Sequence, residues 1–268
     1  MHDLMKNLMT EEEFNSLYLV EQNAISNEVK RFEGYGNPSW INIVRHCNLS
    51  ESTLRKFVDR FGKDAWIEVS CHPLSEKFID DFKQKLEWAD VSQYTIFTKE
   101  QLIKYIDYID WDRAPIYQKN VDEEVIDAVM ASPKKDEFSW HGALVNVKMS
   151  EAFIEKYADE ITKADKWEIV SWYQTLSEEF IEKYKDKLDW NYISQKQQMN
   201  RNFMIKHYDK INPVWCKRYQ KNWDEEIEKE YNFIKTMNNP NFLTELKAVF
   251  TKYGYDYNIF NAMKNTLK

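Results

Sequence analysis

The sequence contains few of the residues and patterns that define several large classes of proteins. Glycine accounts for only five of the 268 residues, and no P-loop, dinucleotide-binding fingerprint or nucleophile elbow is present. The three cysteines, Cys47, Cys71 and Cys216, are too few and too scattered for a disulfide framework, which favours reduced thiols in the cytoplasm. No apolar run approaches the roughly 20 residues of a membrane span, and residues 1–14 lack the basic start and apolar core of a signal peptide. We therefore expect a soluble cytoplasmic protein that binds no cofactor.

The composition is that of a folded, acidic protein. Hydrophobic residues make up 43% of the chain and aromatic residues 15%, which is enough to bury a large core and too much for a disordered chain. The formal net charge of −8 argues against a protein that coats nucleic acid or a membrane surface.

A repeated apolar pattern organises most of the chain. Phe180, Ile181, Tyr184 and Leu188 follow the offsets of 1, 4 and 8 residues that place side chains on one stripe of a helix. A repeat this small cannot bury its own apolar face, so successive repeats must stack. The pattern recurs seven times, at steps of 23 to 28 residues, in segments that begin near Leu49, Leu74, Phe97, Val121, Met149, Leu176 and Met199.

Each repeat carries signals for the start of two helices. Thr98 and Asp122 can cap the first helix in their repeats, and elsewhere a serine N-cap precedes a first-turn glutamate, at Ser50, Ser75, Ser150 and Ser177. Asn37-Pro38 and Asn212-Pro213 mark the start of a second helix. A tryptophan marks the same boundary at Trp66, Trp88, Trp111, Trp140, Trp167 and Trp190. The expected repeat is a helix of about three turns, a tight turn and a helix of about two turns.

The sequence thus predicts an all-α solenoid of about seven two-helix repeats. Residues 49–220 form the array, and residues 1–48 form a diverged N-terminal capping unit that contains the capping box of Thr10 and Glu13. Residues 221–268 form C-terminal capping helices, the last beginning at Asn239-Pro240 and ending at Gly254. Residues 131–142 interrupt the pattern and are predicted to be a protruding loop.

Histidine and cysteine residues suggest a zinc site at first sight. His46-Cys47 and Cys71-His72 carry zinc-ligand types, but the two histidines occupy the same repeat position. Equivalent positions of stacked helices lie roughly 8 to 10 Å apart, which is too far for one ion. A row of partly buried aromatic-type side chains is the favoured interpretation. His207 and Cys216 stand at repeat positions that hold apolar residues in the other repeats, which we call apolar columns, and they are expected in the core.

Carboxylates do not form a recognisable catalytic motif either. A column of aspartates has a lysine three residues earlier in each repeat, which favours exposed ion pairs within one helix over a catalytic dyad. We therefore predict no catalytic, cofactor-binding or metal-binding residue. The aspartates are Asp59, Asp107, Asp159, Asp186 and Asp209, and the lysines are Lys56, Lys104, Lys156, Lys183 and Lys206.

Two further features bear on binding. A glutamine follows the second helix in four repeats, and it either ties neighbouring helix ends together, which we favour, or lines a binding surface. Residues 195–221 concentrate positive charge against Asp209 alone, either as a solvated face or as a site for phosphate or an acidic partner. The glutamines are Gln118, Gln174, Gln197 and Gln220. The candidate partner-binding residues are Lys196, Arg201, Lys217, Arg218 and Lys221 of the basic run, with Phe138 and His141 of the 131–142 segment.

The phrases LSEEFIEKYKDKLDWNYIS and MSEAFIEKYADEI resemble short helical repeats found in many uncharacterised proteins of large DNA viruses and bacteriophages. The resemblance covers roughly residues 49–220 and implies an accessory protein that acts in the host cytoplasm by binding and inhibiting a host defence protein. We accordingly expect a non-enzymatic protein-binding scaffold whose partner has an acidic surface. Binding of nucleic acid or nucleoprotein through the basic C-terminal repeats is the first alternative, and an enzyme with a dispersed site is the second.

Overall fold

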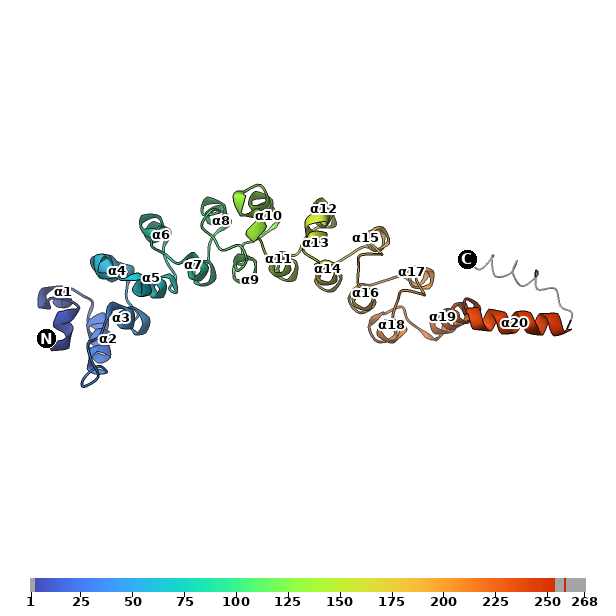
Figure 1. Ribbon diagram of the computed structural model, residues 1–268, viewed down its shortest axis with the longest axis horizontal. Coiled ribbons are helices and arrows are strands. Elements are labelled where there is room, and N and C mark those ends of the chain that lie inside the picture. Colours follow the sequence, from blue (N-terminus) through green and yellow to red (C-terminus); the bar gives the residue numbers. More distant parts are fainter. Residues whose placement is uncertain (1–2, 254–257, 259–268) are drawn as a thin grey trace. The chain divides into compact units, whose positions relative to one another are not determined.

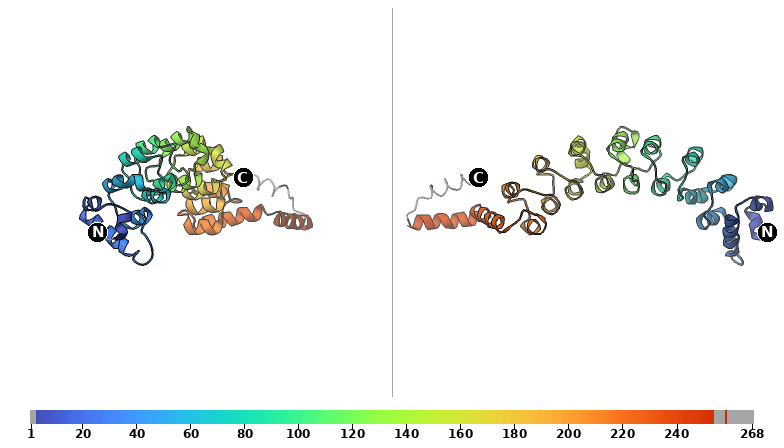
Figure 2. Two further views of the ribbon diagram at one scale, coloured as in Figure 1. Left: turned by 60° about the vertical axis from the view of Figure 1, so that its left-hand side comes forward. Right: turned by 180° about the vertical axis from the view of Figure 1, so that it is seen from behind.

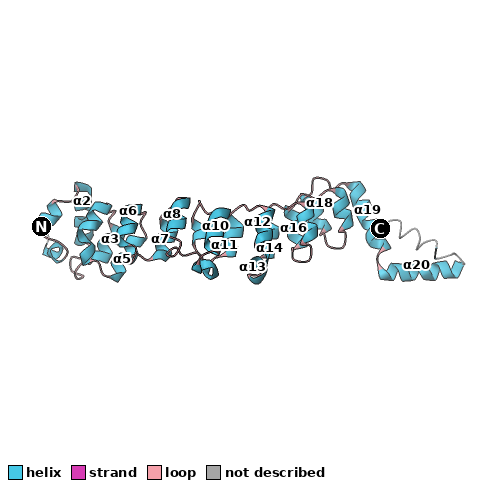
Figure 3. Cartoon of the chain, turned by 90° about the horizontal axis from the view of Figure 1, so that it is seen from above, coloured by secondary structure: helices cyan, strands magenta, loops and turns pink. Residues whose placement is uncertain are grey.

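The computed structural model describes residues 3–253 and residue 258, and every regular element in this part of the chain is a helix (Figures 1 and 3). The all-α prediction is therefore confirmed. The chain divides into two compact units, Met1–Val147 and Lys148–Lys268, which we call the N-terminal unit and the C-terminal unit. The expected end of the last helix at Gly254 lies outside the described residues.

The helices are short, and most have six to eight residues. In the N-terminal unit they are η1 (Asp3–Asn7), α1 (Glu11–Asn15), α2 (Leu19–Lys30), α3 (Trp40–His46), α4 (Glu51–Phe57), η2 (Val58–Arg60), α5 (Lys63–Ser70), α6 (Glu76–Phe82), α7 (Trp88–Tyr94), α8 (Lys99–Lys104), α9 (Ala114–Tyr117), α10 (Glu123–Met130), η3 (Pro133–Glu137) and α11 (Trp140–Asn146). In the C-terminal unit they are α12 (Glu151–Lys156), α13 (Ala158–Lys163), α14 (Trp167–Tyr173), α15 (Glu178–Lys183), α16 (Trp190–Lys196), α17 (Arg201–Lys206), α18 (Pro213–Tyr219), α19 (Glu225–Met237) and α20 (Pro240–Tyr253).

The seven predicted repeats are present, each with a first and a second helix. Within the N-terminal unit the first helices α4, α6, α8 and α10 form one layer, and the second helices α5, α7, α9 and α11 form the other (Figures 1 and 2). Within the C-terminal unit α15 and α17 lie in the first layer, and α14, α16 and α18 pack side by side in the second. Each layer is thus built from equivalent segments of successive repeats.

The predicted helix starts follow the capping chemistry of the sequence. The hydroxyl of Ser177 accepts from the backbone N–H of Phe180 at 3.1 Å, and Ser50, Ser75 and Ser150 cap their helices in the same way. The capping box of Thr10 and Glu13 is also formed. Three of the expected helix starts are wrong. The α3 helix begins at Trp40 with Ser39 as its N-cap, so the Asn37-Pro38 pair lies before the helix. The α5 helix begins at Lys63, three residues before Trp66, and α9 begins at Ala114, three residues after Trp111.

The first helices are shorter than the three turns that the apolar spacing predicts. The α15 helix ends before Tyr184, whose φ of −111° and ψ of 20° lie outside the α-helical region. A turn follows, in which the Leu188 N–H still donates to the Tyr184 carbonyl at 3.2 Å. Leu188 is buried in this turn, so an offset of four residues persists beyond the end of the helix.

The core of each repeat is formed by the predicted columns. Phe180, Ile181, Leu188 and Ile193 are buried, and Tyr184 and Trp190 are partly buried. The Trp190 indole reaches back and donates to the Lys185 carbonyl at 2.8 Å, in the turn that follows α15. Trp88 and Trp111 make the equivalent bond. The tryptophan column therefore satisfies carbonyl groups that the short first helices leave unpaired.

The 131–142 segment, predicted to be a protruding loop, is largely helical. It contains the 3-10 helix η3, which packs against α10, and the start of α11. The backbone N–H of Ser139 donates to the Trp111 carbonyl at 3.0 Å, which ties the segment to the preceding repeat. Gly142 permits the close approach of α11 to α9, because a Cβ atom there would lie 2.9 Å from Cγ1 of Ile116.

Candidate partner-binding surface

The repeated glutamines are structural. Gln197 is 3% exposed, and its Oε1 accepts from the backbone N–H of Leu176 at 3.0 Å. Its Nε2 donates to the carbonyls of Ser171 and Gln174 at 3.1 and 2.8 Å. Gln118 and Gln220 make the same three bonds, one to the first residue of their own repeat and two to carbonyls of the preceding repeat. Each amide clamps the end of one second helix to the next repeat, so the structural interpretation is confirmed.

A second clamp, which the sequence analysis did not identify, uses buried serines in the second helices. The hydroxyl of Ser171 accepts from the backbone N–H of Asp189, the N-cap of the next second helix, at 2.9 Å. Ser92 and Ser194 make the equivalent bonds to Asp110 and Asn212. The sequence does carry a signal for this clamp, because in each of these second helices a serine directly follows the buried Val or Ile of the repeat pattern.

Three of the five lysines that precede the aspartate column pair with the preceding repeat, and not with the aspartate three residues later as predicted. Lys183 pairs with Glu155 at 2.8 Å, and Lys206 pairs with Glu182 at 2.8 Å. Both carboxylates belong to the preceding repeat. Lys104 likewise pairs with Glu76 and Asp80 of the preceding repeat. A long lysine side chain can span two stacked helices, and the carboxylate of the neighbouring repeat lies within its reach.

Most of the basic run is paired with carboxylates in the C-terminal unit. Arg201 binds Glu226 and Glu230 of α19 at 3.0 and 2.8 Å, and Lys217 binds Glu228 at 3.0 Å. Lys210 pairs with Asp186 at 3.2 Å. Arg201 and Lys217 are therefore held by the C-terminal capping helix, which lowers the number of free cations that this run can offer to a partner.

Lys196, Arg218 and Lys221 are the candidate cations that remain available. All three are exposed, and within the described part of the chain none lies within 4 Å of a carboxylate. Lys196 instead lies over the ring of Trp172, with Nζ 3.8 Å from the ring centroid. The Arg218 guanidinium lies 5.4 Å from the ring of Tyr219. Cations in these positions are attracted by the aromatic rings and stay accessible to solvent.

The two candidate partner-binding residues of the 131–142 segment, Phe138 and His141, differ in their exposure to solvent. Phe138 is only 8% exposed and packs between Trp111 and Trp140, with ring centroids 6.4 and 5.2 Å away. The expectation that Phe138 is free for a partner is therefore wrong, because the segment folds back onto the second helices. His141 on α11 is exposed.

Four exposed tyrosines occupy one repeat position near the end of the second helices. In the C-terminal unit Tyr173, Lys196 and Tyr219 occupy this position on α14, α16 and α18. Trp172 packs edge-on against Tyr192 at 4.7 Å, and Trp215 lies 5.9 Å from Tyr219. We call the set of Trp172, Tyr173, Tyr192, Lys196, Trp215, Arg218 and Tyr219 the aromatic–cation face; none of its members is buried. In the N-terminal unit Tyr94 and Tyr117 hold the same repeat position and are 45% and 42% exposed.

The histidines do not converge on a metal site. The Nδ1 atom of His46 lies 2.7 Å from a carboxylate oxygen of Glu28, and the Nε2 atom of His72 lies 3.3 Å from the Val44 carbonyl oxygen. Within residues 3–253 and 258, no group of three or more His, Cys, Asp or Glu side chains could hold a metal ion. His207 and Cys216 are buried in the core as predicted. Burial raises the pKa of the Cys216 thiol to about 11, so that it is protonated at neutral pH.

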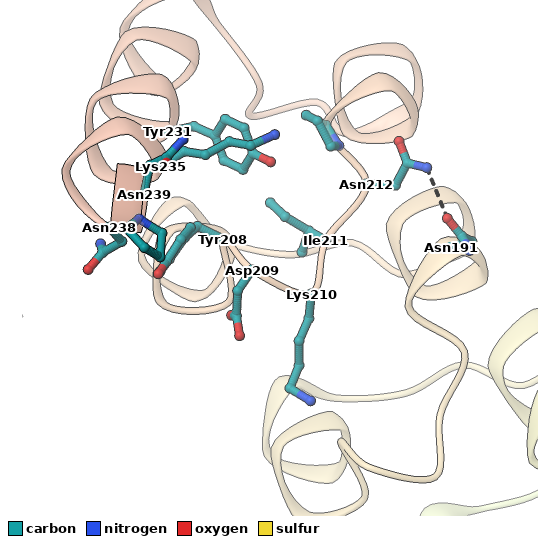
Figure 4. A pocket seen from close by; sticks show the side chains of 12 residues that line it. Asn191, Tyr208, Asp209, Lys210, Ile211, Asn212, Tyr231, Lys235, Asn238 and Asn239 are labelled. Atoms are coloured by element: carbon teal, nitrogen blue, oxygen red, sulfur yellow. Dashed lines mark hydrogen bonds between the residues drawn. The ribbon is translucent and has the colours of Figure 1, made fainter. Parts of the chain in front are cut away.

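A pocket of about 610 Å³ opens where the turn after α17 faces the junction of α19 and α20 (Figure 4). Tyr208, Asp209, Lys210, Tyr231 and Lys235 contribute polar groups to it. Asp209 is the one carboxylate among the described residues that line the pocket, and no nucleophile with an adjacent base is assembled there. The pocket thus provides polar contacts but no recognisable catalytic arrangement.

Comparison of the chain with protein-family models, with curated proteins and with solved structures gave no match. In the described part of the chain, no helix combines the length and apolar character needed to cross a membrane.

Proposed function

We propose that this chain is a non-enzymatic scaffold that binds a protein partner through the exposed positions of its second helices. The main observation behind this proposal is that one repeat position holds a half-exposed tyrosine in four repeats. The exposed fractions are 38% to 45%, and the residues are Tyr94, Tyr117, Tyr173 and Tyr219. Exposed aromatic residues supply much of the binding energy at protein interfaces. The resemblance to viral and phage repeat proteins makes a host defence factor in the host cytoplasm the expected partner.

The positions of these residues support a binding role, because the repeat is stabilised without them. The apolar columns fill the core, the glutamine and serine clamps join neighbouring repeats, and lysines of the first helices pair with carboxylates one repeat away. The tyrosine position belongs to none of these sets. In the N-terminal unit Ile96 and Ile116 extend the exposed apolar surface next to Tyr94 and Tyr117, with exposed fractions of 54% and 51%.

Binding of nucleic acid through the basic repeats is less well supported. Such a site would need several cations aligned for phosphate groups. Arg201, Lys206, Lys210 and Lys217 are instead occupied by carboxylates of the same unit.

A pull-down from nuclease-treated lysate of the native host cell tests the proposal. The bait variants are Tyr94→Ala with Tyr117→Ala, and Tyr173→Ala with Tyr219→Ala. Tyr35→Ala is the matched control, because Tyr35 is 89% exposed and lies outside the repeat array. We expect the wild type and the control to retain one protein at near-equal stoichiometry and at least one pair variant to lose it. Retention of the same proteins by both pair variants, or loss of every partner after nuclease treatment, would contradict the proposal.

A further inference from the structure

The aromatic–cation face of the C-terminal unit has features of a site for a specific class of partner. Its three helices, α14, α16 and α18, are consecutive second helices that pack side by side. Lys196 stands at the repeat position that Tyr173 and Tyr219 occupy on the two neighbouring helices. A cation is thus flanked by an exposed aromatic ring on each side, and Arg218 adds a second cation one residue before Tyr219.

The two cations of this face are exposed, pair with no carboxylate of the described residues and lie near aromatic rings, so they can bind carboxylates from outside the chain. Lys196 lies 3.8 Å above the ring of Trp172, so that its ammonium group has lost water on the side of the ring. Arg218 can present its guanidinium fork to a carboxylate in two parallel hydrogen bonds. By contrast, Arg201 and Lys217 are already paired with α19.

The repeat spacing defines the shape of the segment that fits. Packed neighbouring helices lie about 8 to 10 Å apart, and a polypeptide in the extended polyproline II conformation advances about 3.1 Å per residue with three residues per turn. Every third residue of such a segment therefore points to the same side and meets the next second helix. Side chains between these positions can lie against Trp172, Tyr173 and Tyr219.

We propose that the aromatic–cation face binds an extended acidic polypeptide segment that crosses α14, α16 and α18. Two of its carboxylates, about three residues apart, bind Lys196 and Arg218, and its apolar side chains pack on the exposed rings. The proposal rests on the proposed function as a protein-binding scaffold and specifies the chemistry of one partner site.

The carboxylates near this face favour a polypeptide over a single-stranded nucleic acid. The negative charge of the nearby Glu168 carboxylate raises the pKa of Tyr192. Glu228 stays next to Lys217 at the other end of the face. A nucleic acid would bring a phosphate charge at every nucleotide against these groups, whereas an acidic peptide can place its few charges only where the cations lie.

Selection from a random peptide library tests the proposal directly. The full-length chain is used to select binders from 12-residue peptides displayed on phage, and binders that also retain the variant Lys196→Glu with Arg218→Glu are removed. We expect enrichment of Asp or Glu at a spacing of three residues, with apolar or aromatic residues between them. Affinity is then measured by fluorescence anisotropy with the enriched peptide and with a single-stranded oligothymidylate.

Matched variants separate a specific site from general charge effects. Lys163→Glu with Lys252→Glu makes the same change in net charge on exposed lysines of α13 and α20, which contribute no residue to the face. We expect this control to bind the peptide within about twofold of the wild type, and the face variant to bind at least about tenfold more weakly. Tyr173→Ala with Tyr219→Ala should weaken binding by about fivefold or more while the circular dichroism spectrum stays unchanged.

Three outcomes would overturn the proposal. They are selected peptides without acidic residues, equal losses in the face variant and the control, and tighter binding of the oligothymidylate than of any peptide. If one of these is found while the pull-down still retains a protein in a tyrosine-dependent way, the identity of this site is wrong and the scaffold function stands. If the pull-down also fails, the scaffold function itself is wrong.

Discussion

Replacing Gln197 should destabilise the C-terminal unit through the loss of three defined hydrogen bonds. Its amide accepts from Leu176 N–H at 3.0 Å and donates to the Ser171 and Gln174 carbonyls at 3.1 and 2.8 Å. Gln197→Ala leaves these three backbone groups without that partner. A buried polar group without a partner costs about 1 to 3 kcal/mol, and water that enters the vacated space recovers part of the cost. We expect a loss of roughly 3 to 5 kcal/mol in the free energy of unfolding.

Urea unfolding of the full-length chain, followed by far-ultraviolet circular dichroism, measures this loss. The matched control is Gln198→Ala, because Gln198 is the next residue and is exposed. The control should change the free energy of unfolding by less than about 0.5 kcal/mol. Hydrogen exchange at the Leu176 amide gives a local readout, since repeat arrays can open at one interface before the rest unfolds. A cost for Gln197→Ala below about 1 kcal/mol would refute the clamp as a stabilising element.

A Gln197→Glu variant tests the geometry of the clamp. Glutamate keeps the acceptor for Leu176 but, when ionised, presents a negative charge to two carbonyl oxygens. Burial and these carbonyls should raise the pKa of the introduced carboxyl in the folded state above its unfolded value of about 4.3. The folded state then binds more protons than the unfolded state between the two pKa values. The stability relative to the wild type should therefore fall as the pH rises from about 4 to 7. A penalty that is independent of pH would contradict the donor role of the amide.

Other predictions address the core, the acid limit of stability and the thiols. Phe180→Ala should cost roughly 3 to 5 kcal/mol in urea unfolding, because Phe180 is 3% exposed, and a loss below about 1 kcal/mol would contradict its core position. Lys206, Lys185 and His207 lower the pKa of Glu182 to about 2, so its stabilising effect is complete above its unfolded pKa of about 4.3 and is lost as the pH falls toward 2. In Glu182→Gln the melting temperature should therefore fall less steeply over this range than in the wild type, and equal slopes would contradict the ion pairs. Burial raises the pKa of all three cysteine thiols to about 11, so labelling by a disulfide reagent near pH 8 should be slow and should reach partly buried Cys71 first, whereas rapid labelling of all three would contradict this. Purified protein should contain no stoichiometric zinc, and a chelator should leave its melting temperature unchanged.

The repeat boundaries could be predicted because helix starts depend on local chemistry. A serine hydroxyl bonds to an N–H three residues later, so Ser177 and its equivalents determine the start of a helix without help from distant residues. The length of the first helix could not be predicted in the same way. An offset of four residues is satisfied equally by a helix and by the turn that joins Tyr184 to Leu188, so the apolar pattern does not show where the helix ends.

The candidate site was harder to predict because exposure depends on neighbouring repeats. Phe138 follows a proline-containing, irregular segment, and only the fold of η3 and α11 shows that its ring is enclosed by Trp111 and Trp140. Arg201 is likewise part of a basic run in the sequence, yet α19 brings Glu226 and Glu230 to it from 25 and 29 residues away. A side chain in a predicted loop or charged run can therefore be buried in the core or held in an ion pair, and it is then not free to bind a partner.

In a repeat array, the relevant neighbours of a charged residue lie one repeat away in the sequence. Lys206 pairs with Glu182 and Lys210 with Asp186, each 24 residues earlier. A count of charges within a short window of the sequence therefore misses the carboxylates that neutralise these lysines. The same comparison at Lys196 gives a different result, because the residues 23 positions before and after it are Tyr173 and Tyr219. Lys196 thus has a tyrosine, and no carboxylate, at the equivalent position of each neighbouring repeat, and its ammonium group lies over the ring of Trp172, which stabilises a cation without neutralising it. Its charge stays available to a carboxylate from outside the chain, and for this reason Lys196 is the central residue of the proposed site.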